Sequence, residues 1–121
     1  MNNIQTLNAF WNGFGLPAYD ENTVPDDATM PRITYSVVFG NFDEPVAATA
    51  SLWYYSRSWA DITEKAAEIN SYIGLGGECL PCDGGYLWIK RGNPFAQRMS
   101  DENDGIRRIY INIELEYFTS A

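Results

Sequence analysis

The sequence predicts an α+β domain, in which an antiparallel sheet of four to five strands packs against one central amphipathic helix and an N-terminal helix. Two observations predict this class. Across residues 46–73 the apolar positions first alternate and then recur every three or four residues, which marks a change from strand to helix. Residues 106–118 alternate apolar and polar side chains throughout, as a strand with one buried face does.

Length and composition fit one folded unit. With 121 residues, of which 45% are hydrophobic and 20% charged, the chain can bury one core, so we expect a single domain over residues 1–121. No apolar run approaches the roughly 18 residues of a membrane span, and the N-terminus lacks a signal-peptide pattern. We therefore expect a soluble, cytosolic protein that does not contact membranes.

The charge argues against two classes of function. The formal charge is −8 and there is no histidine. An acidic chain is repelled by phosphate backbones, and a chain without histidine lacks the commonest general base and zinc ligand. We therefore expect neither tight nucleic-acid binding nor catalysis.

Charge is unevenly distributed along the chain. Residues 1–31 contain no Lys or Arg but four acids, whereas five of the eight basic residues lie between positions 88 and 108: Lys90, Arg91, Arg98, Arg107 and Arg108. Such a distribution suits contact between opposite ends of two copies of the chain. A solvated surface with accidental asymmetry is the alternative.

The N-terminal segment predicts a short amphipathic helix followed by an irregular arm. Apolar residues at steps of three and four indicate a helix that ends near Gly13 or Gly15, with Ile4, Leu7, Phe10 and Phe14 on its buried face. Residues 16–31 contain three prolines and four acids without periodicity, so we expect an extended arm or ordered loop. Loops of this length often contact a neighbouring molecule.

A hairpin should follow. Residues 32–40 and 46–55 alternate, and residues 41–45 supply turn signals, so the two strands are expected to pair antiparallel. Ser58 and Asp61 predict a capping box for the central helix, and Gly74 predicts its end. The aromatic cluster here, Trp53, Tyr54, Tyr55 and Trp59, is either a ligand-stacking surface or a core between sheet and helix together with an apolar outer face.

The C-terminal half predicts a tight hairpin, a loop and a central strand. Asp83-Gly84-Gly85 indicates a turn before a strand at residues 86–91, and residues 93–105 form the second long loop. The strand at residues 106–118 should lie mid-sheet, with an inner face of Ile109, Ile111, Ile113, Leu115 and Tyr117.

Three patterns could carry chemistry. Cys79 and Cys82 form a C-x-x-C pair, which could be a redox dithiol, half of a zinc site or two apolar thiols in a turn. Asp101, Glu102 and Asp104 could bind a hard cation, supply an acid/base pair, or form a solvated loop or salt-bridged interface. The glycine pairs match neither phosphate-loop nor dinucleotide spacing, so no cofactor is expected.

Several phrases of the chain resemble a known protein class. The phrases are GFGLPAY, VPDDATMPRITYSV, LWYYSRSWADITEKAAEI and GGYLWIKRGNPFAQRMSDENDGIRRIYINIELEY. Together, in this order over residues 16–118, they resemble the small tail-terminator and minor tail proteins of long-tailed phages and prophages. The Cys79–Cys82 hairpin departs from that pattern.

The resemblance implies a virion protein without enzymatic activity. It implies a ring, usually of six copies, that ends tail-tube polymerisation and provides the surface for head docking. Its implied partners are further copies of itself, the tail tube protein and a head–tail connector, while genomic DNA passes through the lumen without specific binding. The protein would be assembled in the host cytoplasm and reside in the virion tail. A neck or head-completion protein is the alternative in this class, and a small metal or redox module using Cys79 and Cys82 is the alternative in another.

We expect the arm at residues 16–31 and the loop at residues 93–105 to contact neighbouring subunits or the tail tube, with arginines meeting acids across the interface. The candidate interface residues are Tyr19, Asp26, Asp27, Arg91, Phe95, Arg98, Arg107, Arg108 and Tyr110.

Overall fold

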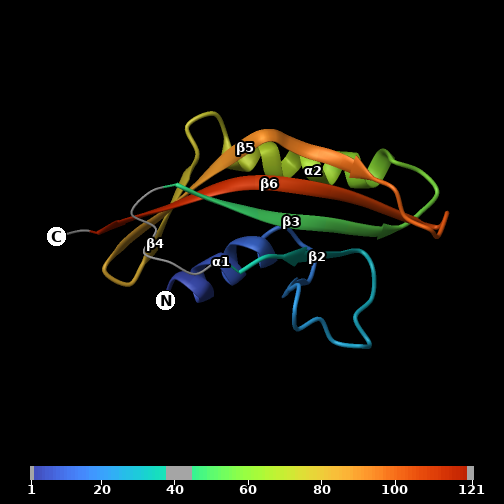
Figure 1. Ribbon diagram of the computed structural model, residues 1–121, viewed down its shortest axis with the longest axis horizontal. Coiled ribbons are helices and arrows are strands. Elements are labelled where there is room, and N and C mark those ends of the chain that lie inside the picture. The colour runs from blue at the N-terminus through green and yellow to red at the C-terminus, as the bar shows by residue number, and fades with distance from the viewer. Residues whose placement is uncertain (1, 38–44, 120–121) are drawn as a thin grey trace.

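The computed structural model describes residues 2–37 and 45–119 and shows one elongated, curved sheet with two helices (Figure 1). The elements are α1 (Asn3–Asn12), β1 (Ala18–Asp20), β2 (Arg32–Tyr35), β3 (Val46–Tyr55), α2 (Ala60–Ile73), β4 (Glu78–Cys82), β5 (Gly85–Met99) and β6 (Ile106–Thr119).

The sheet has six strands in the order β1-β2-β3-β6-β5-β4. The mixed α+β class is confirmed, and β6 lies mid-sheet as predicted, between β3 and β5. The predicted strand number and the purely antiparallel pairing need correction, because β1 pairs parallel with β2. That three-residue strand lies in the proline-containing arm, where no alternation marks it.

The predicted hairpin is confirmed where it is described. Arg32 to Tyr35 pair antiparallel with Trp53 to Ala50, but the strand ends at Tyr35, earlier than expected. The last predicted strand residues, 38–40, and most of the turn at residues 41–45 lie outside the described residues.

The central helix is confirmed, with Ile62, Ala66, Ile69 and Ile73 buried and Gly74 at its end with φ +73°. Its predicted capping box is wrong. The helix begins one residue later than the box requires, with Trp59 at the N-cap and no side-chain cap hydrogen bond there. The Ser58 hydroxyl instead accepts a hydrogen bond from the Ala60 N–H at 3.1 Å.

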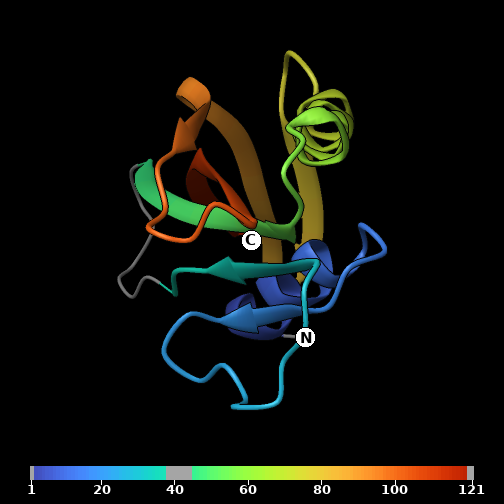
Figure 2. The same ribbon diagram turned by 90° about the vertical axis from the view of Figure 1, so that its right-hand side faces the viewer.

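Both helices pack on the same side of the sheet and share one core (Figure 2). The α1 helix ends at Gly13 as predicted, and Trp11 is fully buried and stacked on Tyr35, with ring centroids 6.5 Å apart. Ile4 was expected on the buried face but is 44% exposed, because it lies one turn before the core contacts of Leu7 and Trp11.

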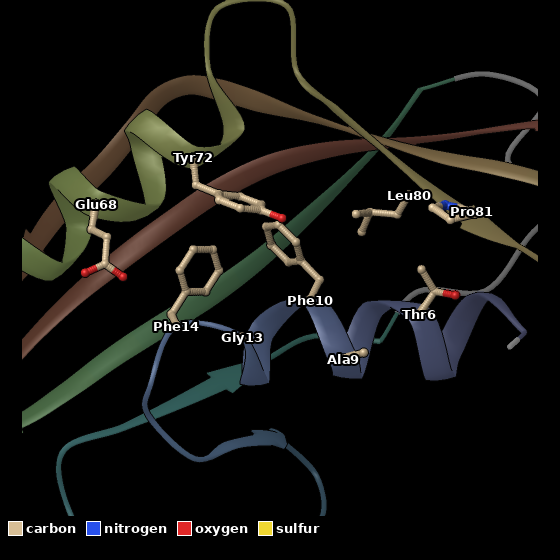
Figure 3. Close-up of a pocket in the computed structure, with 9 residues that line it drawn as sticks. All are labelled: Thr6, Ala9, Phe10, Gly13, Phe14, Glu68, Tyr72, Leu80 and Pro81. Atoms are coloured by element: carbon tan, nitrogen blue, oxygen red, sulfur yellow. The ribbon is translucent and has the colours of Figure 1, made fainter.

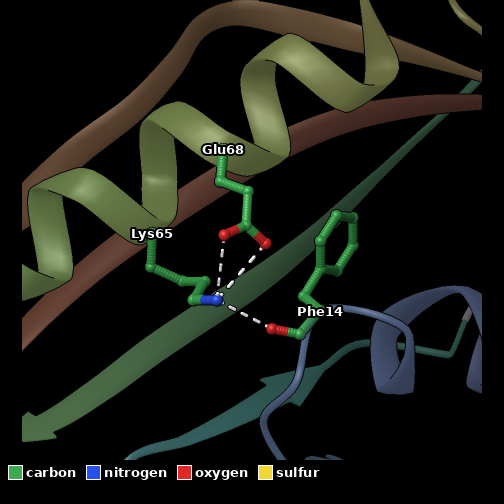
Figure 4. A network of polar contacts seen from close by, with 3 residues as sticks. All are labelled: Phe14, Lys65 and Glu68. Carbon is green, nitrogen blue, oxygen red and sulfur yellow. Dashed lines mark hydrogen bonds and ion pairs between the residues drawn. The ribbon is translucent and has the colours of Figure 1, made fainter.

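A lysine links the two helices (Figure 4). The Lys65 ammonium on α2 donates a hydrogen bond to the Phe14 carbonyl oxygen at 2.8 Å, and it pairs with the Glu68 carboxylate at 3.1 Å. The carbonyl follows the end of α1, so this contact fixes the position of that segment against α2.

The second predicted loop is mostly strand. β5 continues to Met99, and only residues 100–105 form the connection to β6. The pairing with β6 is irregular between Arg91 and Ala96, where a Cβ on Gly92 would lie 2.8 Å from the Asn112 carbonyl oxygen. This irregularity and Pro94 interrupt the alternation, which hides the strand in the sequence. The tight β4–β5 hairpin is confirmed, with Gly84 at φ +78°.

None of the described helices is long and apolar enough to span a membrane.

Candidate interaction surfaces

One tryptophan on the uncovered face of the sheet is flanked by two arginines. The guanidinium carbon of Arg108 lies 4.6 Å from the Trp53 ring centroid, and that of Arg32 lies 5.8 Å away. The Trp53 Nε1–H donates to the Thr34 hydroxyl at 2.9 Å, and Arg108 Nε donates to the Ser51 hydroxyl at 3.1 Å. The ring and the Arg108 guanidinium are therefore held in place by neighbouring strands, while Arg32 donates to the Ala28 carbonyl oxygen at 3.3 Å. We call Arg32, Trp53 and Arg108 the Trp53 cluster.

A second tryptophan, at the start of α2, is flanked in the same way. The guanidinium carbons of Arg98 and Arg107 lie 4.7 Å and 5.2 Å from the Trp59 ring centroid. Arg107 also donates hydrogen bonds to the carbonyl oxygens of Arg57 and Asp104, at 2.8 Å and 2.9 Å. Arg98, Trp59 and Arg107 are called the Trp59 cluster.

Neither cluster contains an ion pair. Among residues 2–37 and 45–119, no carboxylate lies within ion-pair distance of the four arginines, whereas Lys90 pairs with Glu114 at 3.9 Å and Glu116 at 3.6 Å. An exposed cation–π contact contributes only about 0.5–1 kcal/mol, and it leaves the edges of the guanidinium group available for hydrogen bonding. The exposed Arg98 can therefore bind a carboxylate of another molecule, whereas Arg107 already donates to backbone carbonyl oxygens and its Nε atom is buried.

The acidic arm projects from the opposite side of the molecule from β5 and α2 (Figure 2). Asp26 and Asp27 are exposed, and Tyr19 is half-buried in β1. Two backbone hydrogen bonds shape the loop, from Thr23 N–H to the Asp20 carbonyl at 2.9 Å and from Ala28 N–H to the Pro25 carbonyl at 3.1 Å. The loop is thus folded back on itself and presents its acids outward.

The structure separates the candidate interface residues into groups. It brings Arg98 and Arg107 together at Trp59 and places Tyr110 beside Arg108, with the Arg108 guanidinium 5.6 Å from the Tyr110 ring. Arg91 is held by α2, because its guanidinium donates to the Asn70 side-chain oxygen at 2.9 Å. Phe95 is half-buried against the core.

Sequence reasoning did not include Arg32 among the candidate interface residues, and it did not predict that Trp53 and Trp59 would contact arginines. Nothing in the sequence around Arg32 indicates a contact with Trp53. The contact follows from the strand register, which places Arg32 directly opposite Trp53. Trp59 packs against the core and Trp53 lies on the outer face, as the packing alternative for the aromatic cluster expected, and both rings also contact arginines. The outward position of Trp53 in the alternation of β3 was the available signal.

The described surface includes an apolar cavity beside α1 and a groove beside α2. A cavity of about 340 Å³ lies between α1, α2 and β4, and its apolar wall includes Phe10, Phe14, Tyr72 and Leu80 (Figure 3). The Thr6 hydroxyl at this cavity is buried and has no hydrogen-bond partner among the described residues. A groove of about 280 Å³ runs between α2 and β5, with Ala66 and Ala67 on one side, Phe95 to Arg98 on the other, and Ile109 between them.

The cysteine pair lies in a strand, where residues three positions apart point to opposite faces. Cys79 is exposed and Cys82 half-buried, and burial raises the pKa of the Cys82 thiol, with the nearby Asp83 carboxylate adding to the rise. A redox dithiol needs two thiols at one site and a lowered pKa. This geometry favours two structural thiols. Within the described part of the chain, no group of three or more Cys, Asp or Glu side chains could hold a metal ion, and Asp101, Glu102 and Asp104 lie in an exposed turn.

Comparison with known proteins identifies the fold. No protein-family model matches the chain, and no curated protein matches it. Among solved structures, the chain is similar to a component of the virion of a native gene transfer agent particle, with a TM-score of 0.60 and 19% sequence identity. The match covers 94% of this chain and 90% of that one, so the two share a fold over nearly their whole length.

Proposed function

We propose that this chain is a structural protein of a phage-like virion, and that it forms a closed ring at the end of the tail tube. The observation that carries the proposal is the fold shared with a gene transfer agent virion chain over 94% of this sequence. The sequence phrases that resemble tail-terminator proteins point to the same class, independently of the fold.

The ring would end tube polymerisation and present the docking surface for the filled head. Its partners would be further copies of this chain, the tail tube protein and a head–tail connector. A contact between two different surfaces of one chain closes into a ring when the rotation between copies is a simple fraction of a turn, and six copies is the number that the resemblance implies.

The distribution of charge supports such a contact. Exposed acids on the arm lie across the sheet from Arg98 on β5, and four arginines of the two tryptophan clusters lack carboxylate partners among the described residues. With a net charge of −8, the ring would repel DNA in its lumen instead of binding it. We place the protein in the virion tail, assembled in the host cytoplasm.

The test is native mass spectrometry of the purified protein over a range of concentration and salt, with and without isolated tail tubes. We expect a closed oligomer, favoured at low salt, that binds tube ends and stops their growth. A protein that stays monomeric and leaves tube growth unchanged contradicts the proposal. Binding to the portal side of the head instead of tube ends would favour a neck or head-completion protein.

A further inference from the structure

The outer edge of β5 is only partly covered. β5 pairs with β6 along most of its length, but β4 pairs only with Gly85 to Ile89. On the side away from β6, residues 95–99 form no backbone pair with any other part of the described chain, and Ala96, Gln97 and Arg98 are exposed. Such a row of free N–H and C=O groups is a template for a segment of another molecule.

This open edge forms one wall of the groove beside α2. The other wall is built from Thr63, Ala66 and Ala67, and the small alanines leave room for a backbone to approach. An open strand edge beside a helix can accept a segment of another molecule, because the edge supplies main-chain hydrogen bonds and the groove accepts side chains. Arg98, on the same wall, adds a positive charge held against Trp59.

The acidic arm has matching chemistry. Residues 21–31 carry Glu21, Asp26 and Asp27 with exposed side chains, together with the half-buried Val24. These residues of the arm follow β1, at the end of the sheet opposite β5 and β4, so the arm and the groove lie on different surfaces of the molecule (Figure 2).

We propose that the groove between α2 and the open edge of β5 binds the arm of a second copy, an inference that rests on the proposed ring. Val24 fills the apolar groove, and the Asp26 and Asp27 carboxylates accept hydrogen bonds from Arg98 and from the free backbone N–H groups of the edge. The contact joins two different surfaces, so successive copies can continue around a ring.

The test compares three variants of the full chain by native mass spectrometry. Arg98→Glu and the groove-filling Ala67→Trp should each weaken self-association at least about tenfold, because the first reverses the charge contact and the second occupies the groove. Arg57→Glu, which makes the same charge change on an exposed residue outside the groove, should leave association unchanged. Combining Arg98→Glu with Asp26→Arg and Asp27→Arg should restore it.

A second measurement separates this inference from the ring itself. A synthetic peptide of residues 19–31 is added to the isotope-labelled full chain, and the backbone amide shifts are followed by NMR. We expect shifts at residues 63–67 and 95–99 that disappear in Arg98→Glu. Peptide binding without any ring refutes the proposed function but keeps the groove, whereas a ring that survives Arg98→Glu and Ala67→Trp, or peptide shifts elsewhere or nowhere, overturns the groove.

Discussion

The two edges of the sheet differ in how their backbone groups are satisfied. At the β1 edge, the Asn12 side chain accepts a hydrogen bond from the Ala18 N–H at 3.0 Å and donates one to the Ala18 carbonyl at 3.3 Å. The Asp20 carbonyl is satisfied by the Thr23 N–H at 2.9 Å. Asn12 thus replaces a neighbouring strand, whereas no described residue does so for residues 95–99 of β5.

The difference shows how a small sheet protein directs its association. An uncovered edge invites strand pairing with any similar edge, so closing the β1 edge removes one of the directions in which copies could add. The closed edge depends on α1, which Trp11 anchors in the core, while the open edge depends on the irregular end of β5. Variants at each edge can therefore test the comparison.

The largest expected change in the free energy of unfolding is at Trp11, which anchors α1 and so the closed edge. Trp11→Ala should lower the free energy of unfolding by about 3–5 kcal/mol, because it removes a fully buried indole that stacks on Tyr35. Chemical denaturation measures the change. The matched aromatic control is Tyr55→Ala, which removes a side chain that is 74% exposed and should cost no more than about 0.5 kcal/mol.

Asn12→Ala opens the closed edge directly. We expect a loss of about 1–3 kcal/mol in stability, because the Ala18 N–H and carbonyl lose their partners, and faster hydrogen exchange at the Ala18 amide. Gln97→Ala, on the open edge, has no such hydrogen bond to lose and serves as the control. Equal effects of the two variants would contradict the difference between the edges.

A smaller effect of opposite sign, an increase in the free energy of unfolding, is expected at Thr6 in α1. Thr6 is 3% exposed, and its hydroxyl has no hydrogen-bond partner among the described residues. Thr6→Val keeps the shape and removes the buried polar group, so it should raise the free energy of unfolding by about 1 kcal/mol. Thr6→Ser, which keeps the hydroxyl but removes a methyl group, should be destabilising. A destabilising valine variant would contradict this expectation, because it would show that the hydroxyl has a hydrogen-bond partner such as a bound water.

The smallest effect concerns β4, the strand that covers part of the open edge. Burial raises the pKa of the Cys82 thiol, so the folded chain binds its proton more tightly than the unfolded chain. The free energy of unfolding should therefore fall as the pH rises above the unfolded thiol pKa of about 8.5. Chemical denaturation at pH 7 and pH 9.5 measures this loss of stability. The free energy of unfolding should fall less with pH in Cys82→Ser than in Cys79→Ser, because only the first variant removes the thiol with the raised pKa.

The interaction surfaces were less predictable than the elements. The sequence indicated that arginines of the C-terminal half would meet acids of a neighbouring copy, and this stays a prediction. The structure places the arm on the opposite side of the molecule from β5 and α2 (Figure 2). The sequence did not indicate that arginines would be held by Trp53 and Trp59, because those contacts depend on side chains from separate strands.

By itself the sequence determined the elements with strong periodicity. The alternation of β3 and β6, the spacing of apolar residues in α2 and the glycine turns were sufficient, because each is a local pattern with a local cause. Only the tertiary structure decided β1, the second half of β5 and the two edges. A three-residue strand and an irregular strand with Pro94 are stable only through pairing with β2 and β6, and the closure of an edge by Asn12 depends on where α1 packs.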